Sequence, residues 1–247
     1  MKSKALSFLK ITLPILFWLF VWDIFSLIVD HSYFLPSVLE TLRALYLIVF
    51  DVKFIGIVLS TLLRVLTGLF LGIVIGALLA FLSYKIKPLR LFISPLMTVI
   101  KSTPVATVII ILWIALSADA LAVVIALLMV SPIVWQNVLD GFSSLSPALI
   151  EASEIYGFSV RSKIKYLLFP PLFRYFIPAV ITSVGLAWKA EIAAEIIAYT
   201  KNSIGYYIND AKNFYESDKV FAWTLIIIIM SILLEKVTKY LTSRCKV

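Results

Sequence analysis

The chain contains six stretches of mostly apolar residues, each long enough to cross a membrane, and this feature limits its fold more than any other. A helix of about 20 apolar residues spans the hydrocarbon core of a bilayer, where lipid offers the backbone no hydrogen-bond partners. Composition agrees, because 62% of the residues are hydrophobic and only 15% are charged. We predict an all-α membrane protein, a single transmembrane domain over 1–247 with its core at 56–240, and spans at about 11–29, 56–82, 91–117, 120–140, 172–199 and 220–238.

The first apolar stretch follows a basic N-terminus, an arrangement that also occurs in secretory signal peptides. Its length, residues 11–29, exceeds the apolar region of a signal peptide. The "DHSYFLPS" that follows has no small-x-small cleavage pattern. We therefore predict that this stretch is retained as the first span.

Small residues and prolines mark the second, third and fourth spans. Three glycines at four-residue spacing predict a stripe for close helix packing: Gly68, Gly72 and Gly76. The third and fourth spans, separated only by "SAD", are predicted to form a tight hairpin. Prolines interrupt both spans, and kinks there could line a cavity, permit rocking or be static: Pro95, Pro104 and Pro132.

Basic residues indicate the orientation. With a cytoplasmic N-terminus, the inner segments would hold fourteen Lys and Arg residues and the outer segments five. Because Lys and Arg concentrate in cytoplasmic connections, we predict that both termini and the connection between the fourth and fifth spans are cytoplasmic. The net charge of +8 follows from this bias, so we expect no nucleic-acid partner.

The connection between the fourth and fifth spans is too long and too charged to be a simple linker. "SLSPALIEASEIYG" predicts a helix with Ser146 as its N-cap, Pro147 in its first turn and Gly157 as its stop. "SVRSKIKYLLFP" predicts a second helix, capped by Ser159 and ended by Pro170 and its neighbour. We predict a docking segment over 146–170. Gly157 would either supply positive φ beside a docked partner or be an ordinary helix stop.

This segment resembles the E-A-A-x3-G-x9-I-x-L-P signature of permease subunits of bacterial ABC importers. Four signature positions match: Glu151, Ala152, Gly157 and Pro170. Three differ conservatively: Ser153, Leu167 and Phe169. The resemblance implies that Glu151, Ala152, Ser153, Gly157 and Pro170 couple the membrane domain to an ATPase.

Further stretches resemble the nitrate, sulfonate and taurine branch, which also includes importers of thiamine precursors. They are "FLPS" at 34–37, "STLLRVLTGLFLG" at 60–72, "KSTPVA" at 101–106, "AAEII" at 193–197 and "SIGYYI" at 203–208. The resemblance implies a homodimer of permeases, two cytoplasmic ATPase subunits and an extracytoplasmic solute-binding protein.

No nucleotide-binding or metal-binding pattern occurs in the sequence. There is no G-x-x-x-x-G-K-[ST], so ATP would have to be bound by a partner and we expect no cofactor in this chain. With one histidine, His31, and one cysteine, Cys245, neither a thiolate metal site nor an internal disulfide is expected. Intramembrane catalysis is disfavoured for the same reason.

Six charged residues fall within the predicted spans, where their cost in lipid makes them functional candidates: Asp23, Arg64, Lys101, Lys189, Glu191 and Glu195. Asp23 and Arg64 would both lie roughly 10 Å deep and could pair.

A cation near the midplane, Lys101 or Lys189, would suit an anionic solute. Alternatively, either lysine forms an ion pair with Glu191 that holds helices together without contacting a solute. Lys189 departs from the apolar residue expected in nitrate and sulfonate permeases, which leaves other small metabolites open. A different class, an ion-driven secondary transporter, would use Asp23, Glu191 and Glu195 as ion sites.

Overall fold

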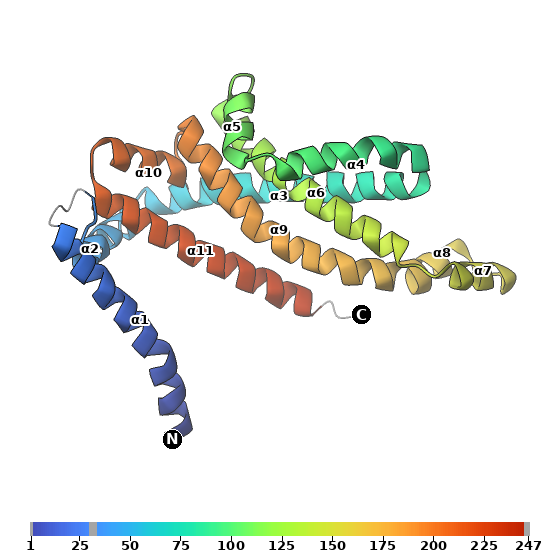
Figure 1. Ribbon diagram of the computed structural model, residues 1–247, viewed down its shortest axis with the longest axis horizontal. Coiled ribbons are helices and arrows are strands. Elements are labelled where there is room, and N and C mark those ends of the chain that lie inside the picture. The colour runs from blue at the N-terminus through green and yellow to red at the C-terminus, as the bar shows by residue number, and fades with distance from the viewer. Residues whose placement is uncertain (1, 30–33, 245–247) are drawn as a thin grey trace.

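The computed structural model describes residues 2–29 and 34–244, and within these ranges the regular structure is helical. Figure 1 shows an elongated bundle whose long helices run roughly along one axis. The expectations for His31 and Cys245 concern positions outside the described residues.

Within residues 2–29 and 34–244, five helices are long and apolar enough to cross a membrane, and a bent helix pair supplies a sixth candidate span. The long helices include the predicted stretches: α1 (Lys2–Val29), α3 (Phe54–Lys85), α6 (Ala118–Ser143), α9 (Phe169–Ala198) and α11 (Ser217–Ser243). The prediction of an all-helical chain with about six spans is confirmed at this level.

The third predicted span, over 91–117, is broken into two helices at Pro104, one of the prolines that were predicted to interrupt it. α4 (Lys87–Ser102) and α5 (Val105–Trp113) meet at an angle of 102°. Thr103 at the break is extended, with φ −76° and ψ 132°, as expected for a residue before proline. Pro104 has no N–H with which to continue the α4 ladder. The other two prolines, Pro95 and Pro132, remain inside helices.

Two short helices that the apolar pattern did not predict lie together at one end of the bundle (Figure 1). α2 (Val38–Val49) begins with a capping box in which Ser37 and Glu40 satisfy each other's backbone N–H groups. α10 (Ile204–Asn213) begins after Ser203. At the opposite end lie α7 (Pro147–Ile155) and α8 (Val160–Ser162). We call the α2 and α10 end the cap end and the α7 end the loop end.

The centre of the bundle is formed by α3, α6 and α9, and the glycine stripe on α3 brings α3 against α6. A Cβ added at Gly68 would lie 2.6 Å from Ala126 Cβ, and one at Gly72 would lie 2.7 Å from Val130 Cβ. A Cβ at Gly76 would lie 2.6 Å from the Ser131 carbonyl oxygen. The predicted packing role of these glycines is confirmed.

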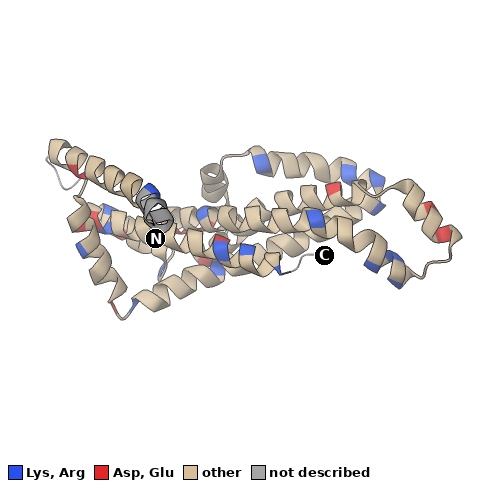
Figure 2. Ribbon diagram, turned by 90° about the horizontal axis from the view of Figure 1, so that it is seen from below, with Lys and Arg blue, Asp and Glu red and all other residues tan. Residues whose placement is uncertain are grey.

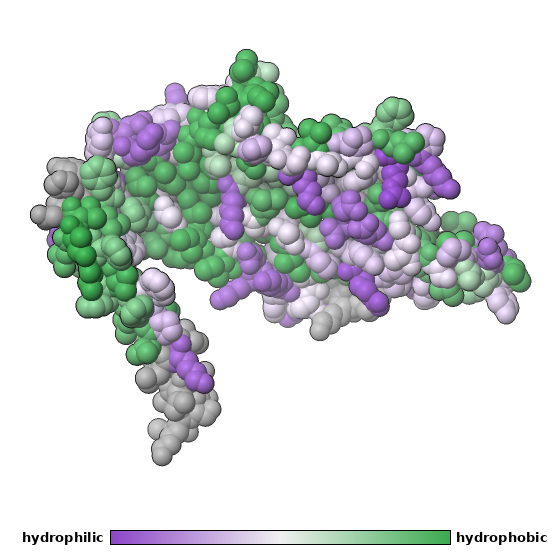
Figure 3. Space-filling view, viewed as in Figure 1, coloured by the Kyte–Doolittle hydropathy of each residue, from purple (hydrophilic) through white to green (hydrophobic). Residues whose placement is uncertain are grey.

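Helix α1 diverges from the rest of the bundle and contacts it mainly at the cap end (Figure 1). Trp22 Nε1 donates to the Pro36 carbonyl at 2.9 Å, and Ser26 Oγ donates to the Leu35 carbonyl at 2.9 Å. The surface of α1 toward the cap end is strongly hydrophobic in Figure 3. Such a surface is suited to lipid or to another apolar protein surface.

Candidate functional site

The docking segment begins as the sequence predicts. Ser146 has the extended conformation of an N-cap residue and Pro147 occupies the first position of α7. The helix ends in a Schellman motif: Gly157 N–H donates to the Glu154 carbonyl at 3.0 Å and Phe158 N–H to the Ser153 carbonyl at 2.9 Å. Gly157 has φ 64°, which confirms that this turn requires positive φ. A Cβ at Gly157 would meet nothing within 4 Å, so the turn faces open space.

The signature residues differ in burial along α7. Glu151 is exposed, Ala152 is half-buried and Ser153 is buried, with its Oγ donating to the Ile150 carbonyl at 2.6 Å. A small side chain at Ser153 therefore fits the inner face of the segment. Large apolar side chains around the turn are exposed: Leu149, Ile155, Tyr156, Phe158 and Val160. Because this turn projects from the loop end (Figure 1), it presents an apolar surface beyond the spans.

The predicted end of the second helix at Pro170 is wrong. Ser159 caps α8 as predicted, with its Oγ accepting from Ser162 N–H at 3.2 Å. The chain then continues through a π-helical segment, η1 (Lys163–Leu168), directly into α9. Pro170 lies in the first turn of α9, where a missing N–H is tolerated. Phe169 N–H bonds to the Ile164 carbonyl across five residues, and this wider turn admits the prolines without ending the helix.

Basic residues are numerous toward the loop end (Figure 2). They lie on α4, α8 and η1 and include Lys87, Arg90, Arg161, Lys163 and Lys165. One of them is paired, since Lys163 Nζ lies 3.6 Å from Glu154 Oε1. This distribution matches the sequence pattern that predicted a cytoplasmic location for this end.

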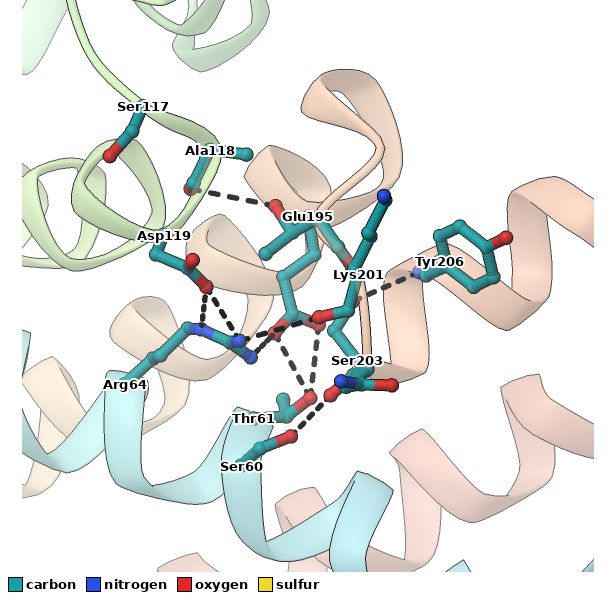
Figure 4. Close-up of polar contacts among 12 residues, drawn as sticks. Ser60, Thr61, Arg64, Ser117, Ala118, Asp119, Glu195, Lys201, Ser203 and Tyr206 are labelled. Atoms are coloured by element: carbon teal, nitrogen blue, oxygen red, sulfur yellow. Dashed lines mark hydrogen bonds and ion pairs between the residues drawn. The ribbon is translucent and has the colours of Figure 1, made fainter. Parts of the chain in front are cut away.

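At the cap end, Arg64 joins three helices through two carboxylates (Figure 4). From α3, its Nη2 and Nε lie 2.7 and 3.0 Å from Asp119 Oδ1, at the start of α6. Its Nη1 lies 3.1 Å from Glu195 Oε1, near the end of α9. The predicted pair of Arg64 with Asp23 is therefore wrong. Asp23 Oδ1 instead accepts from Val38 N–H at 2.9 Å, because α1 meets the bundle at the beginning of α2.

Glu195 also caps helix α10. Its Oε2 accepts from Gly205 N–H at 3.1 Å, and its Oε1 accepts from Thr61 Oγ1 at 3.0 Å. Thr61 Oγ1 in turn accepts from Ile204 N–H at 3.0 Å. A carboxylate at a helix N-terminus satisfies free N–H groups and favours the helix dipole. Glu195 is fully buried, and these donors compensate its desolvation.

Helix α10 approaches α9 too closely for any side chain at Gly205. A Cβ there would lie 2.4 Å from Glu195 Cβ and 2.6 Å from Ile196 N. The contact places α10 directly over the end of α9, with Ser203 Oγ accepting from Tyr206 N–H at 3.0 Å as the local cap. We call Thr61, Arg64, Asp119, Glu195 and Gly205 the outer network.

The outer network brings together three of the stretches that carry the family resemblance. "STLLR" contributes Thr61 and Arg64, "AAEII" contributes Glu195, and "SIGYYI" contributes Gly205. Sequence reasoning singled out the charges in isolation and missed Thr61, Asp119 and Gly205. Thr61 and Gly205 lie in family-like stretches, which was the available signal for them, whereas Asp119 lies outside those stretches. No local pattern links Thr61 or Arg64 to Glu195, which is more than 130 positions away.

The predicted alternative, in which Lys101 or Lys189 pairs with Glu191, is not found in the structure. Glu191 is fully buried, and both of its carboxylate oxygens lack a hydrogen-bond partner among the described residues. Neither Lys101 nor Lys189 forms an ion pair with an acidic side chain of the described residues. Both lysines are exposed, and Lys101 lines a cavity of about 400 Å³ between α4 and α6.

The arrangement offers no cluster of metal ligands. No group of three His, Cys, Asp or Glu side chains that could hold an ion occurs within residues 2–29 and 34–244. The chemistry available is therefore that of packing, hydrogen bonding and charge, at the docking segment, the outer network and the two exposed lysines.

Similar proteins are found among curated transport permeases. The chain is 25% identical over 183 residues to a protein of Bacillus subtilis (strain 168) named as an aliphatic sulfonates transport permease; the match covers 73% of this chain and 66% of the relative, just under two thirds of its length. It is 22% identical to the taurine transport system permease of Escherichia coli (strain K12), covering 87% and 80%. It is 26% identical to a formylaminopyrimidine transport permease of Halalkalibacterium halodurans, covering 94% and 92%.

The fold is also found in a solved structure, described as an amino acid ABC transporter with histidines. The two chains superpose with a TM-score of 0.65 at 17% sequence identity, over 78% of this chain and 94% of the other. At this identity the similarity supports the fold alone. The family model of the binding-protein-dependent transport system inner membrane component matches residues 68–247, which include α6, α9 and the docking segment. The chain therefore belongs to the family of binding-protein-dependent transport system inner membrane components.

Proposed function

We propose that this chain is the permease subunit of an ATP-driven importer, with both termini cytoplasmic, and that it moves a small organic anion across the inner membrane. The observation that carries the proposal is the family match together with a projecting apolar turn at Gly157, where the family signature lies. The chain would work as a homodimer with two cytoplasmic ATPase subunits and an extracytoplasmic solute-binding protein. It would itself be no enzyme and bind no cofactor, because ATP is bound and hydrolysed by the partner.

The docking segment has the properties of a surface that binds another protein. Ile155 and Tyr156 expose 83% and 79% of their surface at a turn that lies outside the candidate spans. Exposed apolar side chains of this size are stabilised when a partner covers them. Glu151 stands exposed beside them and offers a charged contact at the rim.

An anionic solute is supported by two independent features. Lys101 and Lys189 are exposed within candidate spans, without an acidic partner among the described residues, and an ammonium group is costly in lipid unless it faces water or protein. Two of the relatives are named for transport of sulfonates and taurine, and both kinds of solute carry a negatively charged sulfonate group. The formylaminopyrimidine relative makes a thiamine precursor the alternative solute.

The proposal is tested by co-purification with the ATPase encoded in a neighbouring reading frame. Ile155→Glu places a charge in the exposed turn without disturbing packing, so we expect ATPase recovery to fall at least about tenfold. Ile55→Glu is the matched control, because Ile55 is 74% exposed and lies at the start of α3, away from the docking segment. It should recover the ATPase like the native chain.

Equal recovery with both variants would place the docking surface elsewhere. If neither the native chain nor the variants recover the ATPase, the result would contradict the proposed coupling and favour an ion-driven transporter.

A further inference from the structure

A cavity of about 400 Å³ opens between α4 and α6, close to the break between α4 and α5. Helix α4 contributes Thr98, Lys101 and Ser102, and helix α6 contributes Pro132 and Trp135. We call this cavity the α4–α6 notch. Its volume is that of a small-molecule site rather than of a packing defect.

Among the described residues that line the notch, Lys101 alone is charged. It lies about 21 Å along the axis of α4 from Lys87, at about 1.5 Å per residue, and therefore far from the loop end. An exposed ammonium group at such a depth is disfavoured against lipid, so this face of α4 must be covered by water or protein. No acidic side chain of the described residues lies within ion-pair distance of it.

The hydroxyl and indole groups of the notch already donate their protons. Thr98 Oγ1 donates to the Ser94 carbonyl at 2.9 Å, and Ser102 Oγ donates to the Val99 carbonyl at 3.2 Å. Trp135 Nε1 donates to Ser83 Oγ at 3.1 Å. Gln136 Nε2 donates one of its two protons to Asp140 Oδ1 at 2.9 Å and keeps the other. The donors available to a ligand are therefore the Lys101 ammonium and one Gln136 N–H, and the positive charge of Lys101 favours an acceptor-rich, negatively charged group.

The opposite wall of the notch is apolar. Trp135 is 4% exposed and Pro132 is buried, so the wall that they form is held rigidly by packing within α6. Met97 completes the apolar lining from α4. A ligand that fits both walls has a compact oxyanion at one end and a short hydrocarbon portion at the other.

We propose that the α4–α6 notch is a subsite for an organic sulfonate, with Lys101 binding the sulfonate oxygens and Trp135 and Met97 contacting the hydrocarbon. This inference rests on the proposed transport function and names the place where the anion is held within the membrane domain. Lys189 does not line the notch, so its charge makes no direct contact there.

The notch can be tested without identifying the ATPase or the binding protein. The single cysteine is replaced by Cys245→Ser, and Ser102→Cys introduces one thiol in the notch of the full chain in membrane vesicles. The reaction rates of two water-soluble probes are compared: anionic sulfonatoethyl methanethiosulfonate and cationic trimethylammonioethyl methanethiosulfonate. Where the introduced thiol disrupts folding, Gln136→Cys provides a second position on the α6 side.

We expect the anionic probe to react at least about tenfold faster than the cationic probe relative to their rates with a free thiol, because the Lys101 charge lies beside the thiol. Lys101→Gln should abolish this preference. Lys189→Gln, which removes the same charge outside the notch, should leave it unchanged. Butanesulfonate should slow the reaction, whereas butanol at the same concentration should not.

Three results would overturn the proposal. The thiol reacting with neither probe would mean that the notch faces lipid or a closed protein contact. A preference that survives Lys101→Gln would assign the anion attraction to other groups. Equal protection by butanesulfonate and butanol would mean that the charge of the ligand is not recognised. Each result leaves the ATPase co-purification experiment unaffected, so the subsite and the importer function are tested separately.

Discussion

Glu195 shows how one buried carboxylate can stabilise several elements at once. It accepts hydrogen bonds from a guanidinium, a hydroxyl and a backbone N–H that belong to α3 and α10. Removal of a carboxylate that satisfies several buried donors costs more than the loss of one hydrogen bond, because each donor is left desolvated. The same reasoning does not apply to Asp119, whose side chain is 74% exposed.

We expect Glu195→Ala to reduce stability by about 2–5 kcal/mol, because Arg64 and the α10 N-terminus lose a buried acceptor. Glu195→Gln should be intermediate, since an amide oxygen can still accept from Thr61 or Gly205. Asp119→Asn should cost no more than about 1 kcal/mol, as expected for an exposed ion pair. Thermal unfolding of the purified variants measures this order, and equal effects of Glu195→Ala and Asp119→Asn would contradict it.

Gly205 is predicted to tolerate no side chain. The Cβ of Gly205→Ala would lie 2.4 Å from Glu195 Cβ, and backbone atoms on α9 prevent a simple adjustment. We expect α10 to detach locally, which limited proteolysis of the segment after Thr200 would detect. Gly56→Ala is the control, because a Cβ there meets nothing within 4 Å. Protection of α10 in both variants would show that the contact is looser than described.

At the scale of elements, helix ends determine what the docking segment can do. The Schellman motif at Gly157 stops α7 and turns the chain toward α8, so the exposed apolar side chains gather at one projecting turn. The π-helical segment η1 then joins this turn to α9 without a flexible linker. A continuous helical connection of this kind can transmit a displacement of the docking segment to a membrane span.

A test of this element is the pair Gly157→Ala and Gly157→Asn. Alanine at φ 64° costs about 1–2 kcal/mol, whereas asparagine enters this region more readily. We therefore expect Gly157→Ala to weaken ATPase recovery more than Gly157→Asn, with thermal unfolding of the bundle nearly unchanged in both. If Gly157→Asn, which has the larger side chain, recovers less ATPase than Gly157→Ala, the partner requires a small residue at this position and the φ preference is not the cause.

At the scale of the whole molecule, the three candidate regions occupy different places. The docking segment lies at the loop end, the outer network at the start of α10, and the notch at the end of α4 beside the break between α4 and α5. The spans that connect these regions, α3, α6 and α9, pack tightly through small residues such as Gly68 and Gly72. A movement at one end therefore displaces rigid helices rather than bending individual side chains.

Lys189 provides a prediction about the assembled transporter. Its side chain is exposed on α9 and has no ion-pair partner among the described residues, so Lys189→Ala should leave folding and ATPase recovery intact. Because an exposed ammonium group within a span must face water or protein, we expect uptake of the anion by the reconstituted complex to change. Uptake equal to that of the native complex would remove Lys189 from the pathway.

The amino-acid sequence by itself determined the helical class, the approximate spans, the N-cap positions at Ser146 and Ser159 and the positive φ of Gly157. Of the two serines, Ser159 forms a capping hydrogen bond through its side chain and Ser146 does not. These features depend on local hydropathy and local backbone chemistry, which a short stretch carries in full. The sequence also contained Ser37 and Glu40, whose spacing could have predicted α2.

Only the tertiary structure decided which charges meet. Arg64 binds Asp119 and Glu195 rather than Asp23, because the packing of α3 against α6 and α9 sets their distances, and depth in the membrane alone does not specify neighbours around a helix. The size of the bend at Pro104 and the continuation of the helix through Pro170 were likewise visible only in the structure. Hydropathy reports where a residue lies along the membrane normal, and the approach of distant helices determines its partners.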